Sequence, residues 1–194
     1  MTITKRQHYV PQFLLRFFSD LSNVKSKSII SMYMLEQNTI KEKIPIKSVC
    51  YCENIYGDDD IVEKMFSEIE SDWARVLNQM NISNRHIIKR KDKSNIASFI
   101  AFQYLRTKKR EAFLERMTAE WIKYIDPKDA ALFQNKLENN SSISMNLSLI
   151  QFRDFRKYLS DLDYVILDNE SNTEFIISDN PVIFINIFSP NNFG

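Results

Sequence analysis

The chain has 194 residues, of which 44% are hydrophobic and 26% are charged, and its formal net charge is +1 at pH 7. These values are typical of one globular domain and exclude strong non-specific attraction to nucleic acids or anionic membranes. Only two glycines occur, which excludes the glycine-rich phosphate loops of P-loop and dinucleotide-binding enzymes. No run of about 18 apolar residues exists, so we predict no membrane span and a cytoplasmic protein.

The first predicted helix follows a polar stretch near the N-terminus. Pro11 is a typical first helical residue, because its φ is already fixed and it has no amide proton to leave unpaired. A helix from Pro11 places Gln12 and Arg16 on one face, with His8 just before its first turn. His8 is therefore a candidate acid or base, and Gln12 and Arg16 are candidate substrate-binding groups. The alternative is a structural role, in which His8 caps a buried helix and Arg16 pairs with a carboxylate.

The next part of the chain predicts a hairpin and then a helix. Residues 28–35 and 39–44 are rich in strand formers, and a short polar stretch separates them. Three aspartates at 58–60 favour the start of a helix, and the apolar spacing predicts a helix over about 60–80. Glu70 lies at the edge of the apolar stripe of that helix, which makes it a candidate catalytic carboxylate.

The longest predicted helix covers about 95–124 and carries the clearest anomaly in the pattern. Polar residues interrupt its apolar stripe for two turns, at the inward positions Gln103, Arg106, Thr107 and Arg110. Because a guanidinium fork suits phosphates and carboxylates, the glutamine and both arginines are candidate substrate-binding residues. The alternative is a buried network in which the arginines pair with Glu63 or Glu70.

The last part of the chain predicts two further helices and three strands. The helices cover about 127–138 and 147–161, and the strands cover 164–167, 174–177 and 182–185. Asp179 and Asn180, just before the third strand, are candidate catalytic and substrate-binding residues, although such a sequence is also typical of a plain turn. We predict a single α+β domain over residues 1–194, with a mainly helical layer of about five helices and a small antiparallel sheet.

Four motifs spread over nearly the whole chain point to one family. They are His8-Tyr9-Val10-Pro11-Gln12 with Leu15-Arg16, Val62-Glu63 followed by Ile69-Glu70, Phe99 to Gln103 with Arg106-Thr107, and Phe175 to Val182. In this order they resemble the bacterial domain of unknown function 4238 family. The resemblance implies further C-terminal strands that this chain lacks, and a role as a nuclease or toxin in defence against phage.

Two functions from different classes follow from these candidates. The first is a phosphodiesterase acting on RNA or DNA, with His8 as acid or base and with Glu70 and Asp179 orienting it or binding a metal. The second is a non-enzymatic domain that binds a nucleotide, another anion or a protein. A second copy of the chain, or another partner chain, that completes the sheet is a further alternative.

No metal site is predicted by a specific pattern. Cys50 and Cys52 lack the second pair of ligands that zinc needs, and we predict that they are reduced thiols. Glu70 and Asp179 are the alternative ligand pair for Mg²⁺, because hard cations take oxygen ligands. The cofactor therefore stays open, with Mg²⁺ as the one candidate.

Overall fold

The computed structural model describes residues 6–19, 28–53, 60–82, 88–139 and 143–185. These residues form six α-helices, one short 3₁₀ helix and four strands, and the strands make two antiparallel two-stranded sheets. The predicted α+β class is confirmed, with six helices where about five were predicted. His86 and the C-terminal residues 186–194 lie outside the described residues.

The two sheets place the N-terminal motif beside a distant part of the chain. β1 (Arg6–His8) pairs with β4 (Tyr51–Glu53), and β2 (Ile29–Met34) pairs with β3 (Thr39–Pro45). The predicted hairpin is therefore confirmed, whereas the pairing of β1 with β4 was not predicted. The 3₁₀ helix η1 (Ile46–Ser48) connects the hairpin to β4.

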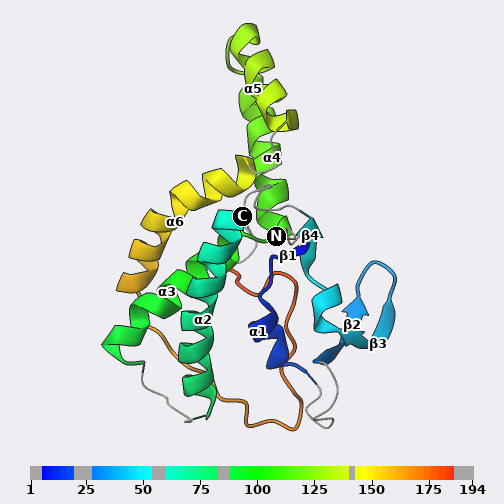
Figure 1. Ribbon diagram of the computed structural model, residues 1–194, viewed down its shortest axis with the longest axis vertical. Helices are drawn as coiled ribbons and strands as arrows, with labels where there is room; N and C mark the ends of the chain where they lie inside the picture. The colour runs from blue at the N-terminus through cyan, green and yellow to red at the C-terminus, as the bar shows by residue number, and fades with distance from the viewer. Residues whose placement is uncertain (1–5, 20–27, 54–59, 83–87, 140–142, 186–194) are drawn as a thin grey trace.

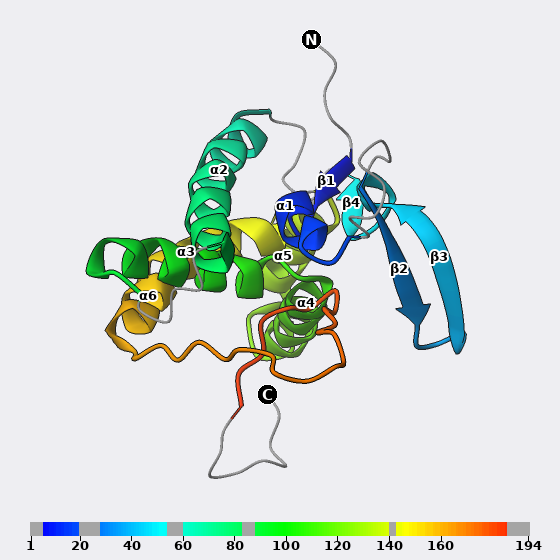
Figure 2. The same cartoon turned by 90° about the horizontal axis from the view of Figure 1, so that it is seen from below.

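The short helix α1 (Gln12–Arg16) follows β1 directly, as the proline predicts. Pro11 occupies the N-cap, and its carbonyl oxygen accepts hydrogen bonds from the amides of Leu14 at 3.1 Å and Leu15 at 3.3 Å. In both overall views α1 lies between the helices α2 and α3 on one side and the β2–β3 hairpin on the other (Figures 1 and 2). The motif thus stands at the centre of the fold.

Aromatic contacts hold α2 (Asp60–Ile82) against α3 (Arg90–Leu105). Phe66 lies 4.3 Å from Phe102 between ring centroids, and Trp73 lies 5.7 Å from Phe99. The same core cluster includes buried residues of the N-terminal segment, namely Tyr9, Val10 and Leu15. Burial of such large apolar side chains is the main source of stability here.

The prediction of one helix over 95–124 is wrong, because α3 ends at Leu105 and α4 (Lys108–Ile122) begins after a break. Thr107 is the N-cap of α4, and its hydroxyl oxygen accepts a hydrogen bond from the Arg110 amide at 3.4 Å. Figure 1 shows α4 and α5 (Pro127–Asn139) projecting from the other elements. Apolar residues far along α4 are therefore exposed rather than buried, as Trp121 shows at 70% exposure.

The last described helix, α6 (Ile143–Asp161), packs on α3 through small residues. Ala97 and Ala101 are fully buried there and share a cluster with Leu159. The three strands predicted after this helix are not formed. Residues 163–185 follow an extended path past the helices (Figure 2) but pair with no strand among the described residues.

Candidate functional site

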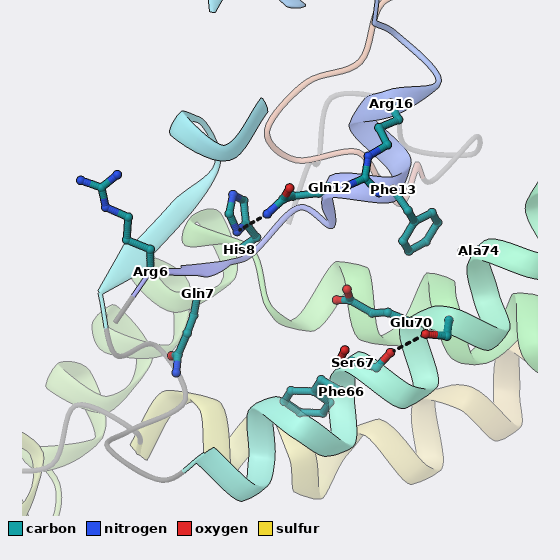
Figure 3. Close-up of a pocket in the computed structure, with 11 residues that line it drawn as sticks. Arg6, Gln7, His8, Gln12, Phe13, Arg16, Phe66, Ser67, Glu70 and Ala74 are labelled. Atoms are coloured by element: carbon teal, nitrogen blue, oxygen red, sulfur yellow. Dashed lines mark hydrogen bonds between the residues drawn. The ribbon is translucent and has the colours of Figure 1, made fainter. Parts of the chain in front are cut away.

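A cleft of about 400 Å³ lies between the N-terminal motif and α2. Figure 3 shows β1 and α1 on one side and α2 on the other. Its lining is mostly polar and consists of Arg6, Gln7, His8, Gln12, Phe13, Arg16, Phe66, Ser67, Glu70, Ser71 and Ala74. Four predicted site residues therefore share one cleft: His8, Gln12, Arg16 and Glu70.

His8 and Gln12 point toward each other at this cleft (Figure 3). Gln12 Nε2 lies 3.4 Å from His8 Nδ1, which is a long and therefore weak hydrogen bond. The two side chains come close because α1 begins at Gln12 and His8 lies four residues earlier, just before the first helical turn. The contact with Gln12 is therefore one that a substrate hydroxyl approaching Nδ1 could replace.

Burial lowers the pKa of His8 below its ordinary value of 6.5, since a charged ring loses hydration there. The nearby carboxylate of Glu70 and backbone hydrogen bonds with Ile46 and Lys47 act in the opposite direction, whereas the guanidinium of Arg106 lowers the pKa further. The net direction of the pKa shift is downward, which favours the neutral ring. A neutral imidazole can accept a proton, as a general base must.

Behind the cleft, a buried polar network joins α2, α3 and the N-terminal segment. Arg106 Nη1 donates to Glu70 Oε1 at 2.6 Å, and its Nε and Nη2 donate to Gln103 Oε1 at 3.1 and 3.0 Å. Gln103 Nε2 in turn donates to the Tyr9 carbonyl oxygen at 2.9 Å. Gln103 and Arg106 are 0% and 2% exposed, and neither lines the cleft. Their contacts are those of the buried network that was the alternative, and their substrate-binding role stays a prediction.

Arg110 also belongs to a different environment from the one predicted. Its Nη2 donates to Gln151 Oε1 of α6 at 2.8 Å, and its guanidinium lies 4.7 Å from the centroid of the Phe113 ring. It lies on α4, beyond the break that ends α3, and does not line the cleft. Arg110 therefore links α4 to α6 and supplies no charge to the His8 cleft.

Asp179 and Asn180 are not in the cleft either. The Asn180 amide donates to Ser178 Oγ at 3.1 Å, as expected for the plain turn that was the alternative. Asp179 is exposed, and its carboxylate acts electrostatically on Tyr9 and Cys50 by raising the pKa of both side chains. Asp179 therefore does not line the His8 cleft, and its catalytic role stays a prediction.

The cysteines and the acidic side chains of the described residues form no cluster that could bind a metal ion. Cys50 and Cys52 are free, and burial raises the pKa of Cys50 to about 11, so that its thiol is protonated at neutral pH. Within the described residues, no group of three or more histidine, cysteine, aspartate or glutamate side chains lies close enough to hold a metal ion. None of the described helices is long and apolar enough to span a membrane.

A second feature of the site depends on the unpredicted pairing of β1 with β4. His8 faces Tyr51 across this pair, with 6.0 Å between the ring centroids. The guanidinium carbon of Arg6 lies 4.9 Å from the centroid of the same Tyr51 ring. No local pattern predicts these contacts, because they depend on two segments more than 40 residues apart.

Comparison with known proteins gives a family and no function. The model of the family described as "Protein of unknown function (DUF4238)" matches residues 6–194, which is nearly the whole chain. This match confirms the resemblance drawn from the four motifs. Searches of curated proteins and of solved structures gave no significant match.

Proposed function

We propose that the chain, which belongs to the DUF4238 family, cleaves phosphodiester bonds of nucleic acid at the His8 cleft. The observation that carries this proposal is that the imidazole of His8 lines a polar cleft of about 400 Å³ together with Arg6 and Arg16. Burial lowers the pKa of that imidazole, which favours the neutral ring. Arg6 and Arg16 are both exposed, and Figure 3 shows their side chains turned outward from the cleft. Exposed guanidinium groups suit the binding of phosphates.

In this proposal each group at the cleft has a defined role. His8 takes the proton of the attacking hydroxyl through its neutral ring, which contributes about 10²- to 10⁴-fold to the rate. Arg16 binds the phosphate and offsets the charge that develops on it, while Arg6 holds the neighbouring part of the substrate. Glu70 acts at a distance, because its carboxylate favours the protonated ring once His8 has accepted the proton.

A degradation assay with labelled nucleic acid tests the proposal. The chain, its His8→Ala and His8→Gln variants and a Lys41→Ala control are compared, with magnesium and with a chelator. Lys41 is exposed on β3, so its loss should leave cleavage unchanged. We expect both His8 variants to be slower by about 10²-fold or more. Equal cleavage by the wild type and the His8 variants would contradict the assignment.

The second candidate is an anion-binding domain without turnover. One observation favours it: the Gln12 amide lies 3.4 Å from His8 Nδ1 and so occupies one of the two ring nitrogens that could accept a proton from a substrate. A nucleotide that raises the melting temperature of the wild type but is never cleaved would support this alternative. Loss of that shift in Arg16→Ala would place the ligand in the cleft.

Phage defence and a cytoplasmic location are the biological side of the proposal. Phage defence is supported by the resemblance from the motifs, whereas the cytoplasmic location is the expectation drawn from the hydropathy of the sequence. A plaque assay on bacteria that express the wild type or His8→Gln tests phage defence together with the activity. We expect the wild type to lower plaque numbers and the variant to lose that protection.

A further inference from the structure

Three side chains form a continuous strip on one face of the β1–β4 pair, which we call the Arg6–Tyr51–His8 strip. Arg6 and His8 are two residues apart on β1, so both point to the same face. Tyr51 lies opposite His8 on β4, and its ring contacts both neighbours. The strip begins at the proposed catalytic residue and leads out of the cleft to an exposed guanidinium.

An arginine stacked on an aromatic ring is a recurring surface for nucleobases. Bases of single-stranded RNA stack on aromatic rings and on the guanidinium planes of arginines. Arg6 is exposed above the half-buried Tyr51, so that its outer side is open to a flat ligand. A base at this position brings its own ribose and the adjoining phosphate toward His8.

We propose, on the basis of the function proposed above, that the substrate is single-stranded RNA, with a base stacked on Arg6 and Tyr51 and its ribose 2′-hydroxyl at His8. The choice of RNA follows from the groups that the cleft supplies. Among the described residues that line it, the candidate bases are His8 and Glu70, and we assign the role to His8 because the Glu70 carboxylate is paired with Arg106 at 2.6 Å. RNA carries its own nucleophile next to the phosphate, and a single base suffices to activate it.

The reaction balances without a co-reactant. His8 takes the proton of the 2′-hydroxyl, and the 2′-oxygen forms a bond to phosphorus. The bond between phosphorus and the 5′-oxygen breaks, and the leaving oxygen takes a proton from water. The products are a 2′,3′-cyclic phosphate and a free 5′-hydroxyl, while the protonated His8 returns its proton to solvent.

Three matched oligonucleotides test the inference with the full chain. They are an all-RNA strand, the same strand in DNA, and an RNA strand in which the nucleotide before the cleavage point is 2′-deoxy. In the presence of a chelator, we expect cleavage of the all-RNA strand with a cyclic phosphate detected by mass spectrometry, no cleavage of the DNA strand, and no cleavage after the 2′-deoxy nucleotide of the third strand. Cleavage of DNA, or at the 2′-deoxy position, would overturn the inference while leaving the proposed phosphodiesterase intact. Cleavage of none would overturn both.

Variants of the strip test the stacking directly. Arg6→Lys keeps the charge but loses the plane, and Tyr51→Leu loses the ring, whereas Tyr51→Phe keeps it. We expect KM for RNA to rise by about tenfold in the first two and to change little in the third. A KM for Arg6→Lys equal to that of the wild type would contradict the stacking. Melting curves of all three identify any variant whose fold is lost. Arg6→Lys is expected to disturb the fold least, because Arg6 is exposed.

Discussion

The buried network behind the cleft and the extended segment 163–185 contrast sharply in one small protein. In the network, the side chains of Gln103 and Arg106 are almost fully buried, and both form hydrogen bonds with other groups of the protein. In the segment, large apolar side chains are exposed, with Ile176 at 95% and Val165 at 82%. Residue type alone therefore predicts burial poorly here, and the availability of partners decides it.

The largest expected effect comes from breaking the network at Arg106. Arg106→Ala leaves the Glu70 carboxylate and the Gln103 amide without their buried partner, which should lower the free energy of unfolding by about 3–5 kcal/mol. The exposed Arg75–Asp72 pair, at 3.6 Å, provides a control. Arg75→Ala should cost at most about 1 kcal/mol. Urea denaturation measures both, and equal losses would contradict the structural role of Arg106.

A smaller effect is expected when the network loses its amide. Gln103→Leu keeps the volume but leaves the Tyr9 carbonyl and two Arg106 donors without a hydrogen bond, at a cost of about 1–3 kcal/mol. Gln134→Leu, on the exposed surface of α5, is the matched control and should be near neutral. An unchanged melting temperature for Gln103→Leu would show that the network is not needed.

Two neighbouring isoleucines sharpen the contrast within the extended segment itself. Ile177 is half-buried and packs against the main core cluster, whereas Ile176 is almost fully exposed. Ile177→Ala should therefore lower the free energy of unfolding by about 1–2 kcal/mol, and Ile176→Ala by less than about 0.5 kcal/mol. Thermal unfolding distinguishes the two. A larger loss for Ile176 would mean that a partner covers it in solution.

The smallest effect concerns the pH dependence of stability. Because the folded pKa of His8 lies below 6.5, the unfolded state binds more protons in acid, and stability falls as the pH drops from about 6.5 through that lowered pKa. The change fades as the pH rises well above 6.5, where the ring is neutral in both states. His8→Gln should flatten this part of the curve. A curve unchanged by His8→Gln would contradict the lowered pKa.

Local signals explain what could be predicted from the sequence. The helix at Pro11 and the position of His8 just before its first turn depend on neighbouring residues, and both were predicted. The contact of His8 with Gln12 was not predicted. The inward positions of Gln103 and Arg106 also followed from the helical period, although the period could not distinguish a ligand site from a network.

Long-range pairing explains what could not be predicted. The Arg6–Tyr51–His8 strip requires β4 to reach β1, and no local pattern specifies that partner. The break after Leu105 had a local signal, since Thr107 is a good N-cap residue, but the surrounding helix formers outweighed it. In residues 163–185 the sequence pattern predicts strands, but these residues pair with no strand among the described residues and so form no sheet.

The most direct test of the central claim is an NMR titration of the two histidine rings, since the chain contains only His8 and His86. His86→Gln assigns the signals, and a DNA oligonucleotide serves as the ligand that lacks a 2′-hydroxyl. We predict that the His8 ring titrates below pH 6.5 and that its signals shift as the oligonucleotide saturates the cleft. A His8 signal unchanged by saturating oligonucleotide would contradict the assignment of this cleft as the site of function.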